Sequence, residues 1–132
     1  MVIDWDRWQE IESCQNRYLK DVEFTRERLS DATLNLRDCE ASLARTVRSS
    51  GQFRRVDVAG WMSDARTNPE RVLAEHRDHP AYPLIAQFHQ AIVAKRRAAD
   101  AHSKAEAALH AHSGAYHQLR KWIHDQQSRG VL

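Results

Sequence analysis

A four–three alternation of apolar side chains runs through the first third of this 132-residue chain. Between residues 4 and 48 no glycine or proline interrupts it. With Trp8 at position a of a seven-residue repeat, the a positions are Trp8, Gln15, Val22, Leu29, Leu36 and Leu43, and the d positions are Ile11, Tyr18, Thr25, Ala32, Cys39 and Thr46. The repeat predicts a long helix over about 4–48 that packs along one seam, as in a coiled coil.

A second three–four pattern predicts another long helix over about 83–128. Its seam reads Leu84, Phe88, Ala91, Lys95, Ala98, His102, Ala105, Leu109, His112, Tyr116, Leu119 and Ile123. The middle of this seam is mostly alanine, which allows a bulkier helix to approach closely. Two helices of this length most simply fold back on each other. The fold class is therefore all-α, a long antiparallel helical hairpin.

The antiparallel register makes specific contacts testable. It brings Trp5 and Trp8 to the region of Trp122 and Ile123, where an aromatic clasp would hold the hairpin shut. At the other end it brings Leu43 to Phe88.

Residues 52–80 lie between the two long helices, and we expect them to form a tip with one or two short helices. Asn68 stands before a proline, the usual start of a helix, so 69–77 is predicted to be helical. A second short helix is predicted over 57–66. All segments together predict a single helical domain over 1–132.

Leu19, Phe24 and Leu34 are large apolar side chains of the first helix that fall outside its seam. A two-helix hairpin cannot bury all three, because they point to different sides. Either another chain or the tip segment would have to cover them. We favour a second copy, in a four-helix arrangement, and predict a homodimer.

The composition argues against a membrane span and against export. The formal net charge is +2, and no apolar run reaches the 18 residues that a spanning helix needs. The start, MVIDWDRW, is acidic where a signal peptide is basic, so a cytoplasmic location is expected. On one helix Cys14 and Cys39 lie about 37 Å apart, which predicts free thiols.

Catalytic motifs are missing from the sequence. The four glycines stand at 51, 60, 114 and 130, too scattered for a phosphate-binding loop. No serine has the context of a nucleophile elbow. We therefore expect no enzymatic activity and no cofactor.

Histidines gather on the C-terminal helix, and three explanations are open for them. His102, Glu106 and His110 follow one another at four-residue spacing, which can place ligands on one metal ion. Glu-x-x-His, the motif of di-iron helical bundles, does not occur on this helix. The second explanation is a pH-dependent change in association, because imidazoles on one border of the seam would repel each other when protonated near pH 6. The third explanation, neutral half-buried histidines beside the seam and no metal, is the one we adopt.

Arginines are the remaining functional signal. The residues that we expect to bind a partner lie in or near the tip segment and are Arg48, Arg54, Arg55, Trp61, Arg96 and Arg97. Such a cluster suits an acidic protein surface. It could also bind nucleic acid through phosphate contacts, with the tryptophan stacked on a base. The sequence thus predicts a non-enzymatic helical interaction protein, an adaptor, chaperone or inhibitor of a larger assembly, with a nucleic-acid accessory protein as the alternative.

In outline, a hairpin of this length resembles stalk proteins of export apparatuses and small secreted helical-hairpin proteins. The Trp-x-Gly turn of the secreted proteins does not occur here, since the order is Ala59-Gly60-Trp61. Outline alone carries little functional information, so no family is assigned.

Overall fold

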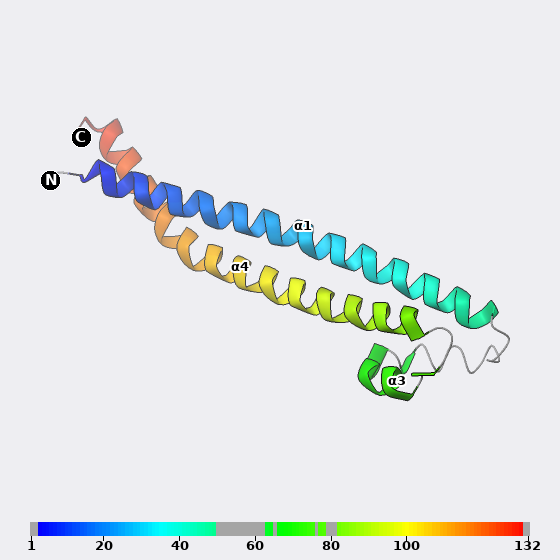
Figure 1. Ribbon diagram of the computed structural model, residues 1–132. Coiled ribbons are helices and arrows are strands. Elements are labelled where there is room, and N and C mark those ends of the chain that lie inside the picture. Colours follow the sequence, from blue (N-terminus) through cyan, green and yellow to red (C-terminus); the bar gives the residue numbers. More distant parts are fainter. Residues whose placement is uncertain (1–2, 50–62, 65, 76, 79–81, 131–132) are drawn as a thin grey trace. The chain divides into compact units, whose positions relative to one another are not determined.

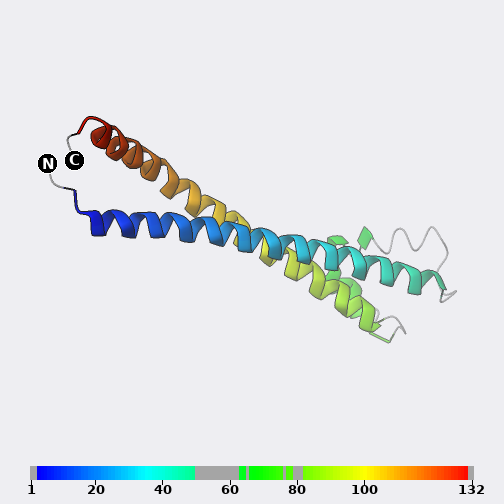
Figure 2. The same cartoon turned by 90° about the horizontal axis from the view of Figure 1, so that it is seen from above.

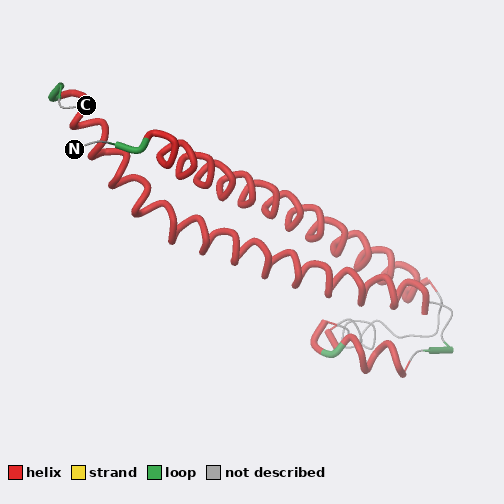
Figure 3. Tube along the Cα trace, turned by 60° about the vertical axis from the view of Figure 1, so that its left-hand side comes forward, coloured by secondary structure: helices red, strands yellow, loops and turns green. Residues whose placement is uncertain are grey.

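The structure, a computed structural model, describes residues 3–49, 63–64, 66–75, 77–78 and 82–130. Its helices are α1 (Trp5–Ser49), α3 (Pro69–Glu75) and α4 (Tyr82–Ser128), as labelled in Figure 1. No strand occurs among the described residues (Figure 3). The two long helices pack against each other, so the predicted all-α helical hairpin is confirmed. None of the described helices could cross a bilayer.

Helix starts follow the sequence signals closely. Asp4 precedes α1, and its Oδ1 accepts a hydrogen bond from the Arg7 N–H at 3.1 Å. Asn68 precedes α3 and caps it in the same way, because its Oδ1 accepts from the Arg71 N–H at 3.2 Å. Each cap satisfies a backbone donor that the first helical turn leaves without a partner.

The chain divides into two compact units, and each contains a stretch of both long helices. Unit 1 comprises Met1–Glu27 and Ala99–Leu132, and unit 2 comprises Arg28–Ala98. Figure 2 shows the two stretches of α1 in blue and cyan, and those of α4 in green-yellow and in yellow to red. The prediction of a single domain remains a prediction.

The apolar core of unit 1 is built around two stacked aromatic rings. The rings of Trp8 and Tyr116 lie parallel, with an interplanar angle of 7° and centroids 5.6 Å apart. Ile123 completes this buried cluster, and Ile3 and Ile11 pack against it. The predicted contact of Trp8 with Ile123 is thus confirmed. The clasp itself needs correction: Trp8 stacks on Tyr116, another seam residue, while Trp5 and Trp122 keep 45% and 36% of their surface exposed.

A buried polar layer crosses the seam of unit 1 further along. Gln15 is only 4% exposed, and its Nε2 donates to Ser113 Oγ at 3.0 Å. Its Oε1 lies 2.7 Å from His112 Nδ1. Since an amide oxygen can only accept, the Nδ1 of His112 carries the hydrogen. The ring of His112 also lies 5.0 Å from that of Tyr18.

The core of unit 2 joins all three helices. Leu43 of α1, Val72 of α3 and Phe88 of α4 are each 2% exposed or less, and they form one buried cluster with Ile85 and Ile92. The predicted contact of Leu43 with Phe88 is confirmed. Burial of Ile85 and Ile92, which lie beside the predicted seam, was not predicted; it arises in the core to which α3 adds Val72 and Leu73.

Burial along α1 agrees with the predicted repeat. All its a and d residues are buried or half-buried, whereas the off-seam residues Leu19, Phe24 and Leu34 are 43%, 57% and 51% exposed. Cys14 and Cys39 are half-buried free thiols. The second predicted short helix lies largely outside the described residues.

Replacement of Leu43 tests the unit 2 core. Leu43→Ala should lower the free energy of unfolding by about 2–5 kcal/mol, because it removes a fully buried side chain and leaves a cavity. Leu34→Ala, the same change at a half-exposed position of the same helix, should change it by less than about 0.5 kcal/mol. Urea unfolding followed by circular dichroism measures both; equal effects would contradict this packing.

Candidate functional site

Three of the predicted partner-binding residues are described, and all three are exposed. Arg48 lies in the last turn of α1, and Arg96 and Arg97 lie on α4. No described acidic side chain forms an ion pair with any of them. Their guanidinium groups are therefore available to a ligand. Arg54, Arg55 and Trp61, the other predicted members, lie outside the described residues.

Register divides these arginines into two groups. Leu43 of α1 and Phe88 of α4 share one buried cluster and so mark the same level of the two helices. Arg48 follows Leu43 by five residues, and Arg96 follows Phe88 by eight. Because α1 and α4 are antiparallel, these offsets add to an axial separation of about 20 Å at 1.5 Å per residue. One small ligand cannot bridge the two groups, but an extended protein surface can.

Positive charge concentrates in unit 2. This unit holds 12 Lys and Arg against 8 Asp and Glu, a formal charge of +4, whereas unit 1 holds 8 against 10, a charge of −2. Several acids of unit 2 already have cationic partners: Arg66 pairs with Glu40, and Arg71 pairs with Asp64 and Glu75 at 3.6 and 3.5 Å. These pairs cancel positive and negative charge alike, so they leave the +4 of unit 2 unchanged.

An apolar groove lies on unit 1, beside the stacked aromatic rings. Its walls come from the start of α1 and the end of α4, and its apolar lining residues are Ile3, Trp8, Ile11, Leu119, Trp122 and Ile123. Leu119 and Trp122 are 38% and 36% exposed, so large apolar surface faces solvent. The sequence placed both residues near the seam and did not predict that they stay uncovered.

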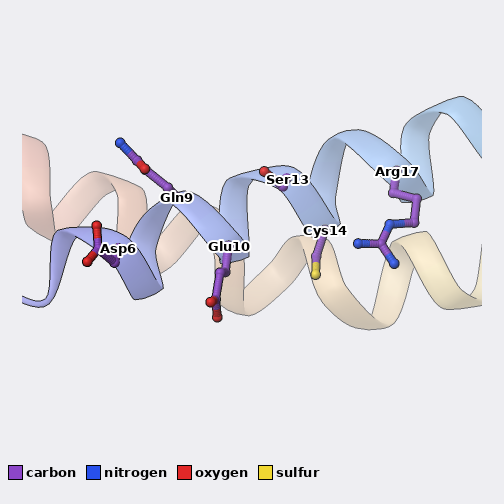
Figure 4. A pocket seen from close by; sticks show the side chains of 6 residues that line it. All are labelled: Asp6, Gln9, Glu10, Ser13, Cys14 and Arg17. Atoms are coloured by element: carbon purple, nitrogen blue, oxygen red, sulfur yellow. The ribbon is translucent and has the colours of Figure 1, made fainter.

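A second hollow is polar and is built by one helix alone. Figure 4 shows its six side chains, Asp6, Gln9, Glu10, Ser13, Cys14 and Arg17, all from α1. Gln9 points away from Glu10 and Cys14 in this view. Groups that diverge from one helix do not converge on a reacting atom, so this hollow has no catalytic geometry.

His102 is held by partners on both sides of its ring. Its Nε2 lies 2.6 Å from Glu106 Oε1, and its Nδ1 lies 3.0 Å from Thr25 Oγ1. A carboxylate only accepts, so Nε2 carries a hydrogen. In the neutral ring, Nδ1 accepts from the Thr25 hydroxyl. In the protonated ring, Nδ1 donates to it, and Thr25 can turn its own hydrogen to the carbonyl of Asp21, 2.8 Å away.

These hydrogen bonds bear on the metal hypothesis. Both nitrogens of His102 have partners within unit 1, so a metal ion at Nδ1 would have to displace Thr25, and one at Nε2 would have to replace the hydrogen that Glu106 accepts. His110, the third residue with ligand spacing, is exposed. Within the described part of the chain, no three His, Cys, Asp or Glu side chains lie close enough to hold a metal ion.

Comparison with known proteins gives no match to a protein-family model, to a curated protein or to a solved structure.

Chelation tests the metal hypothesis. We expect the melting temperature to stay the same when zinc is added and when a chelator follows, because the described residues bring no three ligand side chains together. Circular dichroism melts measure this. A melting temperature that rises with zinc, falls with chelator and no longer responds in His110→Ala would contradict the expectation.

Proposed function

We propose that this chain is a non-enzymatic helical interaction protein that acts as a homodimer and binds an acidic surface of a protein partner through the arginines of unit 2. Adaptors, chaperones and inhibitors of larger assemblies work in this way. The residues that we assign to partner binding are Arg48, Arg96 and Arg97, together with Arg54, Arg55 and Trp61 of the tip segment. A cytoplasmic location remains part of the proposal.

The observation that carries the proposal is the exposure of Arg48, Arg96 and Arg97 without any acidic partner among the described residues. A guanidinium group matches a carboxylate with two parallel hydrogen bonds, which makes arginine suited to acidic protein surfaces. Two arginine groups about 20 Å apart along the helices fit the span of a protein interface better than a small anion.

Nucleic-acid binding is the second candidate, and the charge distribution supports it less well. A phosphate backbone favours a continuous row of cations. Here Asp31 and Asp38, both exposed, lie on α1 in the same unit as Arg96 and Arg97, and the two arginine groups are separated. A partner with discrete carboxylates tolerates such interruptions, whereas a uniform polyanion does not.

Charge reversal tests the proposal on two probes. A fluorescein-labelled polyglutamate peptide stands for an acidic protein surface, and a single-stranded oligonucleotide carries the same number of charges. Arg96→Glu with Arg97→Glu should weaken peptide binding roughly tenfold, because two attractions become repulsions. Fluorescence anisotropy in low salt measures both probes.

The matched control is Arg17→Glu with Lys20→Glu, which reverses two exposed cations of unit 1. Each double variant lowers the net charge of the chain by four, since each charge reversal changes it by two. The two variants therefore differ only in where the reversed charges lie. Equal losses in both variants would mean that the peptide senses net charge alone, against the proposal. Tighter, strongly salt-dependent binding of the oligonucleotide would favour the second candidate.

A further inference from the structure

The outer side of α4 in unit 1, which we call the α4 outer face, has small side chains at its centre and the exposed polar residues Lys104 and Gln118 on either side of them along the helix. Its centre consists of Ala107, Ala108, Ala111, Gly114 and Ala115, all exposed. At 100° per residue, they lie within about 60° of Ala111 around the helix. A side chain built on Gly114 would meet no atom within 4 Å, so nothing in the described structure covers this face.

Trp122 connects the α4 outer face to the apolar groove of unit 1. It lies about 20° from the direction of Ala111, it lines the groove, and it is 36% exposed. One end of the face therefore presents a large ring, and at the other end Ala101 is exposed on the flank of the face, about 80° from the direction of Ala111. If a second copy runs in the opposite direction, the large group of each face lies opposite the small group of the other.

We infer that a second copy of this chain covers the α4 outer face, with the two α4 helices antiparallel about a two-fold axis at Ala111. This rests on the proposed homodimer and assigns its interface. Trp122 follows Ala111 by eleven residues, and Ala101 precedes Ala111 by ten. Trp122 of one copy therefore lies over Ala101 of the other. The small residues around Ala111 let the helix backbones approach near the axis, and the interaxial distance depends on such side chains. Further out, Lys104 of one copy lies opposite Gln118 of the other, each about 20° from the direction of Ala111.

Charge complementarity singles out this pairing. Asp100 lies eleven residues before Ala111 and Lys121 lies ten residues after it, so the two come level across the two-fold axis to within about 1.5 Å along the helix. Asp100 lies about 20° from the direction of Ala111, and Lys121 reaches in from the same flank, at about 80°. Both are exposed, and neither forms an ion pair with a described residue. The two-fold symmetry forms the contact between Asp100 and Lys121 twice, once at each end of the interface. A parallel arrangement of the same helices would oppose like charges.

The off-seam residues of α1 do not offer an equivalent surface. Leu19 and Phe24 point about 140° apart around the helix, so they cannot lie on one contact stripe. The self-association predicted from them is therefore reassigned to α4.

The size of the α4 outer face sets how tight the dimer is. From Asp100 to Trp122 the face is about 33 Å long and about 10 Å wide, so two copies cover roughly 700 Å². Stable interfaces bury about 1,200–2,000 Å². The dimer should therefore dissociate on dilution.

Sedimentation equilibrium over a wide concentration series tests the interface on the full chain. The natural sequence should show a reversible monomer–dimer equilibrium. Ala111→Glu should raise the dissociation constant about 100-fold or more, because it sets two carboxylates against each other on the two-fold axis. Ala41→Glu, at an exposed alanine of α1, is the matched control and should leave it unchanged.

A charge swap makes the test independent of packing. Asp100→Lys and Lys121→Asp should each weaken the dimer several-fold, and both changes in one chain should restore it. Dimers that survive Ala111→Glu, or a double variant that fails to recover, would overturn the interface and leave the proposed homodimer standing. A monomer at every concentration would overturn the homodimer as well.

Discussion

The alignment of α1 with α4 in unit 1 depends on one buried amide. Gln15 occupies a seam position where an apolar residue would pack with less constraint, and only one register supplies its partners on α4, Ser113 and His112. A buried polar side chain left without partners costs about 1–3 kcal/mol, so shifted registers are disfavoured. The observed register brings Trp8 onto Tyr116 and leaves Trp122 uncovered. The exposed end of the α4 outer face thus follows from a hydrogen bond several turns away.

Periodicity alone predicted the two long helices, their seams and the contact of Leu43 with Phe88, because an unbroken four–three pattern allows few other structures. The burial of Ile85 and Ile92 could not be predicted in this way. Both lie beside the seam, in a core that includes residues of α3. A two-helix pattern contains no information about a third packing surface.

The functional residues were harder to predict for a related reason. Arg48, Arg96 and Arg97 were grouped from their nearness to the turn, but register separates them by about 20 Å along the helices. The α4 outer face was missed because alanine is common on exposed helices. It becomes informative only once burial shows which alanines the seam uses and which stay exposed. His102 is explained by Thr25, a partner that only the packed helices bring within reach.

Charge and exposed apolar surface lie in different units of this protein. Unit 2 carries the excess of arginine, and unit 1 carries the groove and the α4 outer face. We assign self-association to unit 1 and partner binding to unit 2. The two surfaces come close on α4, where Arg97 lies three residues before Asp100.

Size-exclusion chromatography with light scattering and absorbance at 260 and 280 nm, on protein purified in low salt, tests this account most directly. The account predicts a species heavier than the 15.3 kDa chain that carries no excess absorbance at 260 nm. A 15.3 kDa monomer at every loading concentration, or nucleic acid that co-elutes and leaves as salt is raised, would contradict it.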